Sequence, residues 1–95
     1  MPMNVLHQPE AHRFAIQLDG HVARVDYALR PGAIVLKHTE VPDALGRRGI
    51  GSALARHALD WAAAQGLKVD PQCDFMRGYI DKHPEYQAGS LAHGA

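Results

Sequence analysis

The segment from residue 45 to residue 52 reads Leu45-Gly46-Arg47-Arg48-Gly49-Ile50-Gly51-Ser52. Its three glycines lie within six residues, so the backbone can turn sharply and keep its N–H groups uncovered by side chains. The residues that follow have a helical pattern, and the first N–H groups of a helix have no partner inside the helix. Because the helix dipole adds positive potential at the same place, the segment predicts a seat for a phosphate or pyrophosphate.

Side chains of the same segment favour an anion, since Arg47 and Arg48 add positive charge and Ser52 adds a hydroxyl. Two common phosphate loops are excluded. A Walker A loop ends in Gly-Lys-Ser/Thr, and this segment has no lysine. The dinucleotide fingerprint would need a glycine at Leu54. The alternative is a glycine-rich helix entry that only turns the chain, and spacing alone does not separate the two interpretations.

The elements on either side of this segment follow from hydrophobic spacing. Apolar residues at Ile50, Leu54, Ala58 and either Trp61 or Ala62 predict a helix from Gly49 onward, which Gly66 is suited to end. Before the segment, residues 33–41 predict a strand that Pro42 stops, because proline has no backbone N–H to donate.

Two more elements are expected after the helix. Residues 67–69 predict a short strand, cut off by Asp70-Pro71. Residues 74–82 predict a second helix with three side chains turned inward, those of Phe75, Tyr79 and Ile80.

The first part of the chain has the pattern of an antiparallel meander. Residues 12–18 alternate, with Phe14, Ile16 and Leu18 on one side. Asp19-Gly20 is a strong two-residue hairpin signal, so residues 21–29 are expected to return as a second strand. Arg30-Pro31-Gly32-Ala33 has the composition of a type II turn leading into the third strand.

The predicted order is therefore β-β-β-α-β-α, and the strand-helix-strand unit over 33–69 should be a right-handed crossover with parallel strands. The fold class is α/β (α+β), an antiparallel meander followed by a βαβ unit and a C-terminal helix. Residues 12–88 are expected to form one domain, preceded by a flexible lead-in over 1–11 and followed by a flexible tail over 89–95.

Composition narrows the classes of function. Ten basic and ten acidic residues cancel in a chain of 95 residues, so no bulk attraction to nucleic acid or to an anionic membrane is expected. No signal peptide and no apolar run of about 20 residues is visible.

Cys73 is the single cysteine, which suits a reducing cytoplasm. The seven histidines show no helical metal-ligand pair, so no metal site is predicted. The small core is compatible with a monomer or a weak homodimer.

The glycine-rich segment resembles the Q/R-x-x-G-x-G/A loop of the GCN5-related N-acetyltransferase (GNAT) family. The resemblance is closest to the short YjdJ-like or NATD1-like GNAT proteins and covers roughly residues 12–88. One departure is that Gly46 stands where the family loop has Gln or Arg. The matching segments are His38-Thr39-Glu40-Val41-Pro42, residues 45–51, Pro71-Gln72-Cys73, Tyr79-Ile80 and His83-Pro84-Glu85-Tyr86.

The resemblance implies a minimal GNAT fold that binds acetyl-CoA or coenzyme A. In such folds the strands corresponding to 33–41 and 67–70 splay apart, and the pantetheine arm runs into the gap. The implied cofactor-binding residues are Thr39, Glu40 and Val41 for the pantetheine, Gly46, Arg47, Arg48, Gly49, Ile50, Gly51 and Ser52 for the pyrophosphate, and Cys73 near the sulfur.

The resemblance also implies direct acetyl transfer to a primary amine, with a backbone N–H near residues 38–41 stabilising the oxyanion. Candidates for the base are Glu40 and His38, and the alternatives are a solvated strand-end carboxylate and a hydrogen-bonded sheet histidine. Tyr79 could protonate the leaving thiolate or be a core aromatic. Cys73 could accept the acetyl group, line the pocket, or be a small buried residue.

These observations favour a cytoplasmic acetyl-CoA-dependent N-acetyltransferase whose acceptor is an amine on a small molecule, a peptide or a protein. The alternative is a non-catalytic acyl-CoA-binding module or a partner-binding domain.

Overall fold

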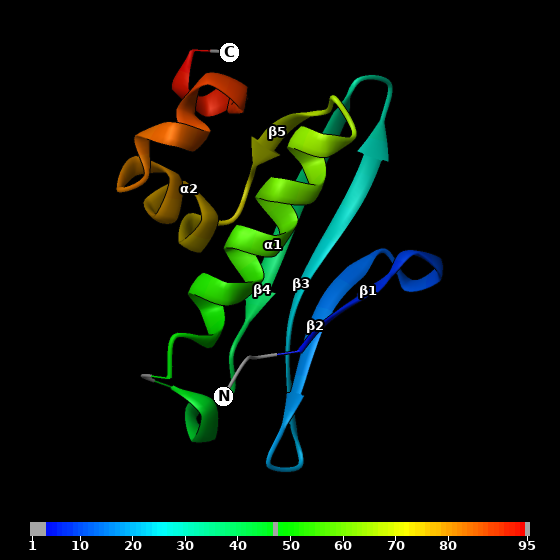
Figure 1. Ribbon diagram of the computed structural model, residues 1–95, viewed down its shortest axis with the longest axis vertical. Helices are drawn as coiled ribbons and strands as arrows, with labels where there is room; N and C mark the ends of the chain where they lie inside the picture. Colours follow the sequence, from blue (N-terminus) through cyan, green and yellow to red (C-terminus); the bar gives the residue numbers. More distant parts are fainter. Residues whose placement is uncertain (1–3, 47, 95) are drawn as a thin grey trace.

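A computed structural model of the chain describes residues 4–46 and 48–94. Its centre is a five-stranded sheet with the order β1-β2-β3-β4-β5, in which β1 to β4 are antiparallel neighbours and β5 is parallel to β4. Helix α1 lies across the sheet and α2 lies beyond β5 (Figure 1). The strands are β1 (Val5–Gln8), β2 (Arg13–Leu18), β3 (His21–Arg30), β4 (Ala33–Glu40) and β5 (Lys68–Pro71), and the helices are α1 (Ile50–Ala64) and α2 (Asp74–Asp81).

The predicted fold class is confirmed, because the meander β2-β3-β4 leads into the parallel unit β4-α1-β5. Local turn chemistry places these elements. Asp19 and Gly20 both have positive φ, 53° and 77°, as a tight hairpin requires. Gly32 has a φ of 75° between β3 and β4, which agrees with the predicted type II turn.

The core lies between the sheet and α1. Phe14 and Val25 from the sheet are fully buried, as is Leu54 from α1. Alternation along each strand turns the next residues to the opposite face of the sheet, where β3 and β4 carry polar side chains. No helix within residues 4–46 and 48–94 is long and apolar enough to cross a membrane.

Strand β5 corrects one expectation, because it continues through Asp70-Pro71 instead of ending before them. Pro71 pairs in register with Leu36 of β4 and is buried. A proline is tolerated here because β5 lies at the end of the strand order, where a missing N–H on the outer side costs no ladder hydrogen bond.

Helix α2 corrects a second expectation. Met76, Tyr79 and Ile80 are its buried residues, whereas Phe75 is 43% exposed and does not face the core. Both sets satisfy helical spacing, so periodicity over a helix of eight residues did not fix which side is inward.

The described part of the expected lead-in over 1–11 contains a strand and a short helix. Val5–Gln8 pairs antiparallel with β2, and a short 3-10 helix, η1 (Pro9–Ala11), follows. The His7 ring stacks on Phe14 at a centroid distance of 4.2 Å, and its Nε2 lies 2.7 Å from the Tyr27 hydroxyl. These contacts with distant residues, more than the weak local pattern, hold β1 on the sheet.

The expected flexible tail is also packed in residues 89–94. Two 3-10 helices, η3 (Pro84–Gly89) and η4 (Leu91–His93), follow α2. Ser90 lies between them, is fully buried and forms a parallel bridge with Val69 of β5. The Ser90 Oγ is 2.6 Å from His93 Nδ1, and His93 Nε2 also contacts Asp81.

Candidate functional site

The two parallel strands separate halfway along β4. Pairing between β4 and β5 runs from Ala33 with Lys68 to Leu36 with Pro71 and then ends. In the remaining half of β4, residues 38–40 are paired in the described chain with β3 only, and Lys37 lies at a register shift between Asp26 and Tyr27 of β3. One edge of this stretch is therefore open to a ligand that can hydrogen-bond to extended backbone.

The start of α1 lies where this opening ends. Gly49 precedes the helix with a φ of 72°, a left-handed conformation that glycine adopts without strain. Gly49 offers no side-chain cap, and the first turn of α1 contains no acidic residue. The N–H groups of Ile50, Gly51 and Ser52 are therefore available as donors, and the predicted role of this turn in holding an anion stays a prediction.

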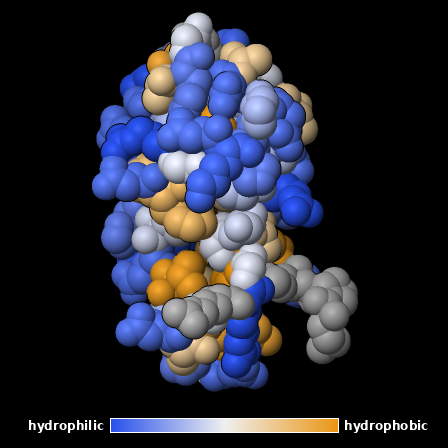
Figure 2. Space-filling model, turned by 90° about the vertical axis from the view of Figure 1, so that its left-hand side faces the viewer, coloured by the Kyte–Doolittle hydropathy of each residue, from blue (hydrophilic) through white to orange (hydrophobic). Residues whose placement is uncertain are grey.

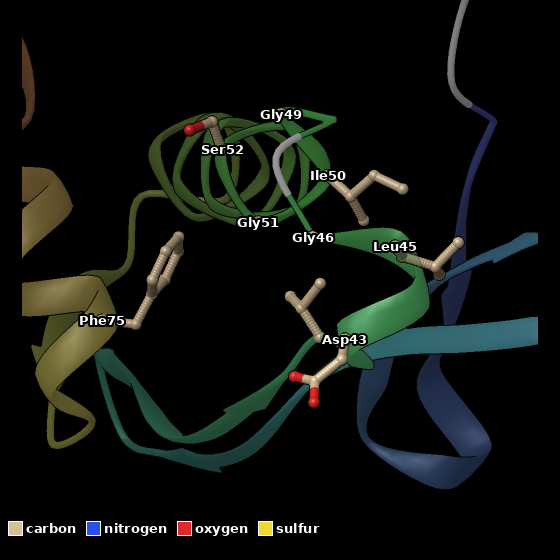
Figure 3. Close-up of a pocket in the computed structure, with 9 residues that line it drawn as sticks. Asp43, Leu45, Gly46, Gly49, Ile50, Gly51, Ser52 and Phe75 are labelled. Carbon is tan, nitrogen blue, oxygen red and sulfur yellow. The ribbon is translucent and has the colours of Figure 1, made fainter.

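A groove of about 520 Å³ lies in front of this helix start. Figure 3 shows it framed by the first turn of α1, by the 3-10 helix η2 (Asp43–Leu45) and by Phe75 of α2. The same side of the molecule, drawn in Figure 2, is mostly hydrophilic, with hydrophobic atoms gathered in its lower half. Six of the predicted cofactor-binding residues line the groove, namely Val41, Gly46, Gly49, Ile50, Gly51 and Ser52.

Three lining residues were not predicted as site residues: Asp43, Leu45 and Phe75. Leu45 is buried beneath the turn. Asp43 brings a carboxylate to a groove otherwise suited to an anion, and no signal in the sequence linked it to the glycines. Phe75 comes from a helix about 25 residues further along the chain, so only the folded structure brings it to this place.

Phe75 lies directly against the first turn of α1. A Cβ added at Gly51 would come within 2.6 Å of the end of the Phe75 ring, closer than carbon atoms pack. Gly51 therefore has a packing role besides keeping the helix N–H groups uncovered, because it lets the ring lie over the helix start. The two residues together form one wall of the groove (Figure 3).

The structure differs from the prediction that the Arg48 side chain adds positive charge to the groove. The Arg48 guanidinium is paired with the Asp19 carboxylate of the β2–β3 hairpin, and Arg48 does not line the groove. Both side chains are about half exposed, so solvent weakens this pair and a competing anion could replace Asp19. The prediction for Arg47 lies outside the described residues.

Cys73 bridges the opening between the strands. It precedes α2, and its Sγ accepts a hydrogen bond from the Met76 N–H at 3.4 Å, which caps the helix. The same sulfur lies 3.1 Å from Thr39 Oγ1 of β4. The structure thus brings together the predicted residues Thr39 and Cys73 beside the open edge of β4.

The two candidate bases lie on the other face of β4. Thr39 points toward the helices, so the adjacent His38 and Glu40 project from the polar face. The two side chains lie 3.5 Å apart and are more than half exposed. The Arg24 guanidinium is 3.5 Å from Glu40 and 3.1 Å from Asp26, which restrains the Glu40 carboxylate near the end of the strand.

Tyr79 stands apart from the groove and from both bases. It is 8% exposed, and its ring stacks on His83 at 3.8 Å. The His83 Nδ1 is 2.6 Å from the Tyr79 carbonyl oxygen. Tyr79 lines a neighbouring hollow that shares Ser52 and Phe75 with the groove.

The fold and the groove define an α/β domain with an open strand edge leading to a glycine-rich helix start. The sequence profile of the GCN5-related N-acetyltransferases matches residues 13–89. The chain belongs to this family.

Known proteins similar to this chain agree with the assignment. Protein NATD1 from Mus musculus is 33% identical over 87 residues, which cover 87% of this chain and 78% of the mouse protein. Protein NATD1 from Gallus gallus has the same identity and coverage. The NMR structure of a GCN5-like protein from Staphylococcus aureus superposes with a TM-score of 0.76 at 26% identity, covering 94% of this chain and 88% of that one. Family and fold together support an acyl-transfer role.

Proposed function

We propose that this protein is an N-acetyltransferase that uses acetyl-CoA and transfers the acetyl group directly to a primary amine. The observation that carries the proposal is the continuity of two features. The unpaired edge of β4 over residues 37–40 leads straight to the uncapped helix start at Gly49. An extended pantetheine arm can pair with the first, and a pyrophosphate can be seated on the second.

The chemistry of the lining fits this substrate. Backbone N–H groups of Ile50, Gly51 and Ser52 supply donors that need no charged partner. Val41 and Phe75 add apolar wall on the side where the chain of the substrate would enter. Cys73 and Thr39 lie beside the open edge, where the acyl-bearing sulfur is expected.

The two faces of β4 suggest how donor and acceptor meet. The acyl donor would lie on the helix side, and the acceptor amine would approach from the polar face that carries His38 and Glu40. One of these side chains accepts a proton from the ammonium form of the acceptor. The free amine then attacks the thioester carbonyl carbon; as the C–S bond breaks, the attacking nitrogen loses a proton to become the amide, and the leaving thiolate takes up one proton, so that the proton count balances.

A neutral backbone N–H within residues 38–41 is the proposed donor to the developing oxyanion. No covalent acyl-enzyme is required, so the Cys73 thiol is assigned to lining and bridging the opening. A cytoplasmic setting goes with this proposal, since the thiol of Cys73 stays reduced there.

Calorimetric titration of acetyl-CoA into three forms of the protein tests the binding step. Ser52 occupies the third position of α1, where a carboxylate stabilises a helix by about 0.5 kcal/mol through the dipole. Ser52→Glu should therefore fold normally while repelling the pyrophosphate, and its affinity should fall by at least about tenfold. Ser52→Ala is the matched control and should lose much less affinity, because it removes only a hydroxyl and keeps the backbone N–H donors. Equal binding by Ser52→Glu and the wild type would contradict the proposal.

A binding module without turnover is the second candidate. It is favoured by the position of His38 and Glu40, which share no hydrogen bond or ion pair with Cys73 or Tyr79 in the described residues. Release of free CoA thiol with a panel of primary amines separates the two candidates. Turnover that falls in Glu40→Gln with unchanged acetyl-CoA affinity supports the enzyme, whereas tight binding without thiol release supports the module.

A further inference from the structure

Four ionisable side chains form a compact group on the polar face of the sheet. Arg24 of β3 lies directly opposite Glu40 of β4, and Asp26 of β3 lies directly opposite His38. Residues that oppose each other on one face of antiparallel strands have side chains within mutual reach, so these four occupy the corners of a square. The two candidate bases, His38 and Glu40, therefore share their surroundings with Arg24 and Asp26.

The Arg24 guanidinium contacts both carboxylates of this square. Its Nε donates to the Asp26 carboxylate at 3.1 Å, and its Nη1 lies 3.5 Å from Glu40 Oε2. A guanidinium presents its donors in a rigid planar fork, so one arginine can orient two carboxylates at once. The Arg24 and Asp26 side chains are about one-third exposed, so solvent screens the bond between them only in part.

This arrangement determines which carboxylate faces the His38 ring. Glu40 Oε1 lies 3.5 Å from His38 Nε2, whereas the Asp26 carboxylate, although it belongs to the residue opposite His38, is turned toward Arg24. A carboxylate beside one ring nitrogen favours the proton on that nitrogen. Neutral His38 therefore carries its proton on Nε2, and Nδ1 keeps the lone pair that can accept another proton.

We propose that Arg24 is a positioning residue for the proton-accepting step. By holding both carboxylates, it keeps Glu40 instead of Asp26 beside the His38 ring and so maintains the tautomer whose Nδ1 is free. The inference rests on the proposed function, and it assigns the acceptor's proton to His38 Nδ1. Without Arg24, the Asp26 carboxylate is released to turn toward the ring opposite it, where it competes with Glu40 for the ring proton.

The proton transfer itself balances within this group. An N–H bond of the acceptor ammonium breaks, its electron pair stays on the nitrogen, and the proton forms a new N–H bond at His38 Nδ1. The ring thereby becomes an imidazolium, and the adjacent Glu40 carboxylate stabilises its charge. Arg24 touches neither the acceptor nor the proton in this step, and its effect is exerted through the two carboxylates.

A second arginine pair on the polar face provides a matched control. The Arg30 Nη1 of β3 lies 3.2 Å from the Asp70 carboxylate of β5. In the described residues this pair shares no ion pair with His38 or Glu40. Arg30→Gln therefore removes an arginine–aspartate pair from the same face of the sheet and leaves the square intact.

Nitrogen NMR of the histidine rings tests the tautomer without any need for turnover. Spectra at about pH 8.5, where an ordinary histidine is neutral, show which ring nitrogen carries the proton. His38→Gln identifies the His38 signals. The wild type, Arg24→Lys and Arg30→Gln should all show mainly the form with the proton on Nε2, and Arg24→Gln should show a larger share of the form with the proton on Nδ1.

Release of CoA thiol with the most active primary amine tests the kinetic consequence, with thermal unfolding to verify each fold. Arg24→Gln should lower kcat about threefold to fivefold, the range of a partly exposed ion pair, while the affinity for acetyl-CoA stays unchanged. Arg24→Lys should retain most of the wild-type kcat, and Arg30→Gln should retain all of it. Adding Asp26→Asn to Arg24→Gln should restore turnover, because the competing carboxylate is then removed.

Three results would overturn the inference while leaving the proposed function intact: an unchanged His38 tautomer in Arg24→Gln, equal kcat in Arg24→Gln and Arg30→Gln, or no recovery of turnover in the double variant. A folded wild type that releases no thiol would instead overturn the proposed transfer reaction. The NMR spectra would still decide, in that case, whether Arg24 sets the His38 tautomer.

Discussion

Thr39 Oγ1 and Cys73 Sγ lie 3.1 Å apart and connect β4 to the start of α2 across the opening between the two parallel strands. The sulfur also caps α2 through the Met76 N–H. A single side chain thereby fixes the position of α2 relative to the free edge of β4. Cys73 was considered as a nucleophile from the sequence. In the structure its sulfur joins β4 to the start of α2, a structural role that does not require a reactive thiolate.

Substitution of Cys73 should distinguish its structural role from a role as a nucleophile. Cys73→Ser keeps a hydrogen-bonding cap and should retain both stability and acetyl transfer, because direct transfer needs no thiolate on the protein. Cys73→Ala loses the cap and should lower the free energy of unfolding by about 1 kcal/mol. Denaturant unfolding and thiol-release assays measure the two effects. Loss of turnover in a stable Cys73→Ser, with an acetylated cysteine in the wild type by mass spectrometry, would instead establish a covalent intermediate.

The Asp43 carboxylate should weaken anion binding, because it lines the groove at the helix start. Asp43→Asn removes the charge with little change in shape, so acetyl-CoA affinity should rise about threefold at low salt and less at high salt. Asp19→Asn is a useful companion, since it releases Arg48 from its pair on the hairpin. Titration of both variants is the measurement, and a drop in the affinity of Asp43→Asn would show that this carboxylate holds the turn in place.

Gly51 and Phe75 should behave as a coupled pair. Gly51→Ala places a methyl group against the end of the Phe75 ring, which must move because the gap is only 2.6 Å. Since alanine favours a helix and the ring is partly exposed, stability should change by less than about 1 kcal/mol, but ligand affinity should fall. Adding Phe75→Ala should relieve the contact. A double-mutant cycle on affinity and unfolding measures the coupling, and strictly additive effects would contradict it.

Acid should loosen the first strand through His7. Burial lowers the pKa of His7 below its ordinary value of 6.5, and the neighbouring His57 acts in the same direction, while Glu10 opposes them. The unfolded chain therefore takes up the proton at higher pH than the folded chain does. Stability is unaffected above about pH 6.5 and declines as the pH falls below it.

His7→Gln should flatten this pH dependence, whereas His21→Gln in the exposed hairpin should not. Denaturant unfolding from pH 7.5 down to pH 5 is the measurement. An unchanged acid sensitivity in His7→Gln would assign the effect to another group.

Features governed by local chemistry could be predicted from the sequence. Asp19-Gly20 and Gly32 have the φ angles that their turns demand, and Gly49 and Gly66 flank α1 as expected. The position of the glycine-rich helix start could be predicted from three glycines beside a helical pattern, although their spacing alone did not distinguish an anion seat from a simple turn.

Features governed by distant contacts could not be predicted. Strand β1 depends on His7 packing against Phe14 and Tyr27, which local periodicity does not record. The orientation of α2, which buries Met76 and lays the half-exposed Phe75 against Gly51, depends on contacts between the helices that local periodicity does not record. The ion pair between Arg48 and Asp19 joins residues 29 positions apart in the sequence, so local patterns do not indicate it. For this reason the Arg48 charge was expected at the groove and not at the hairpin.

The bridge between Ser90 and Val69 has a consequence for behaviour in concentrated solution. The outer edge of β5 would present free N–H and C=O groups to any passing chain, and such edges promote strand-to-strand aggregation. Pro71 at the end of the strand and Ser90 beside Val69 both interrupt that edge. A chain that ends before residue 90 should therefore self-associate at concentrations where the longer chain stays dispersed, even while its fold persists.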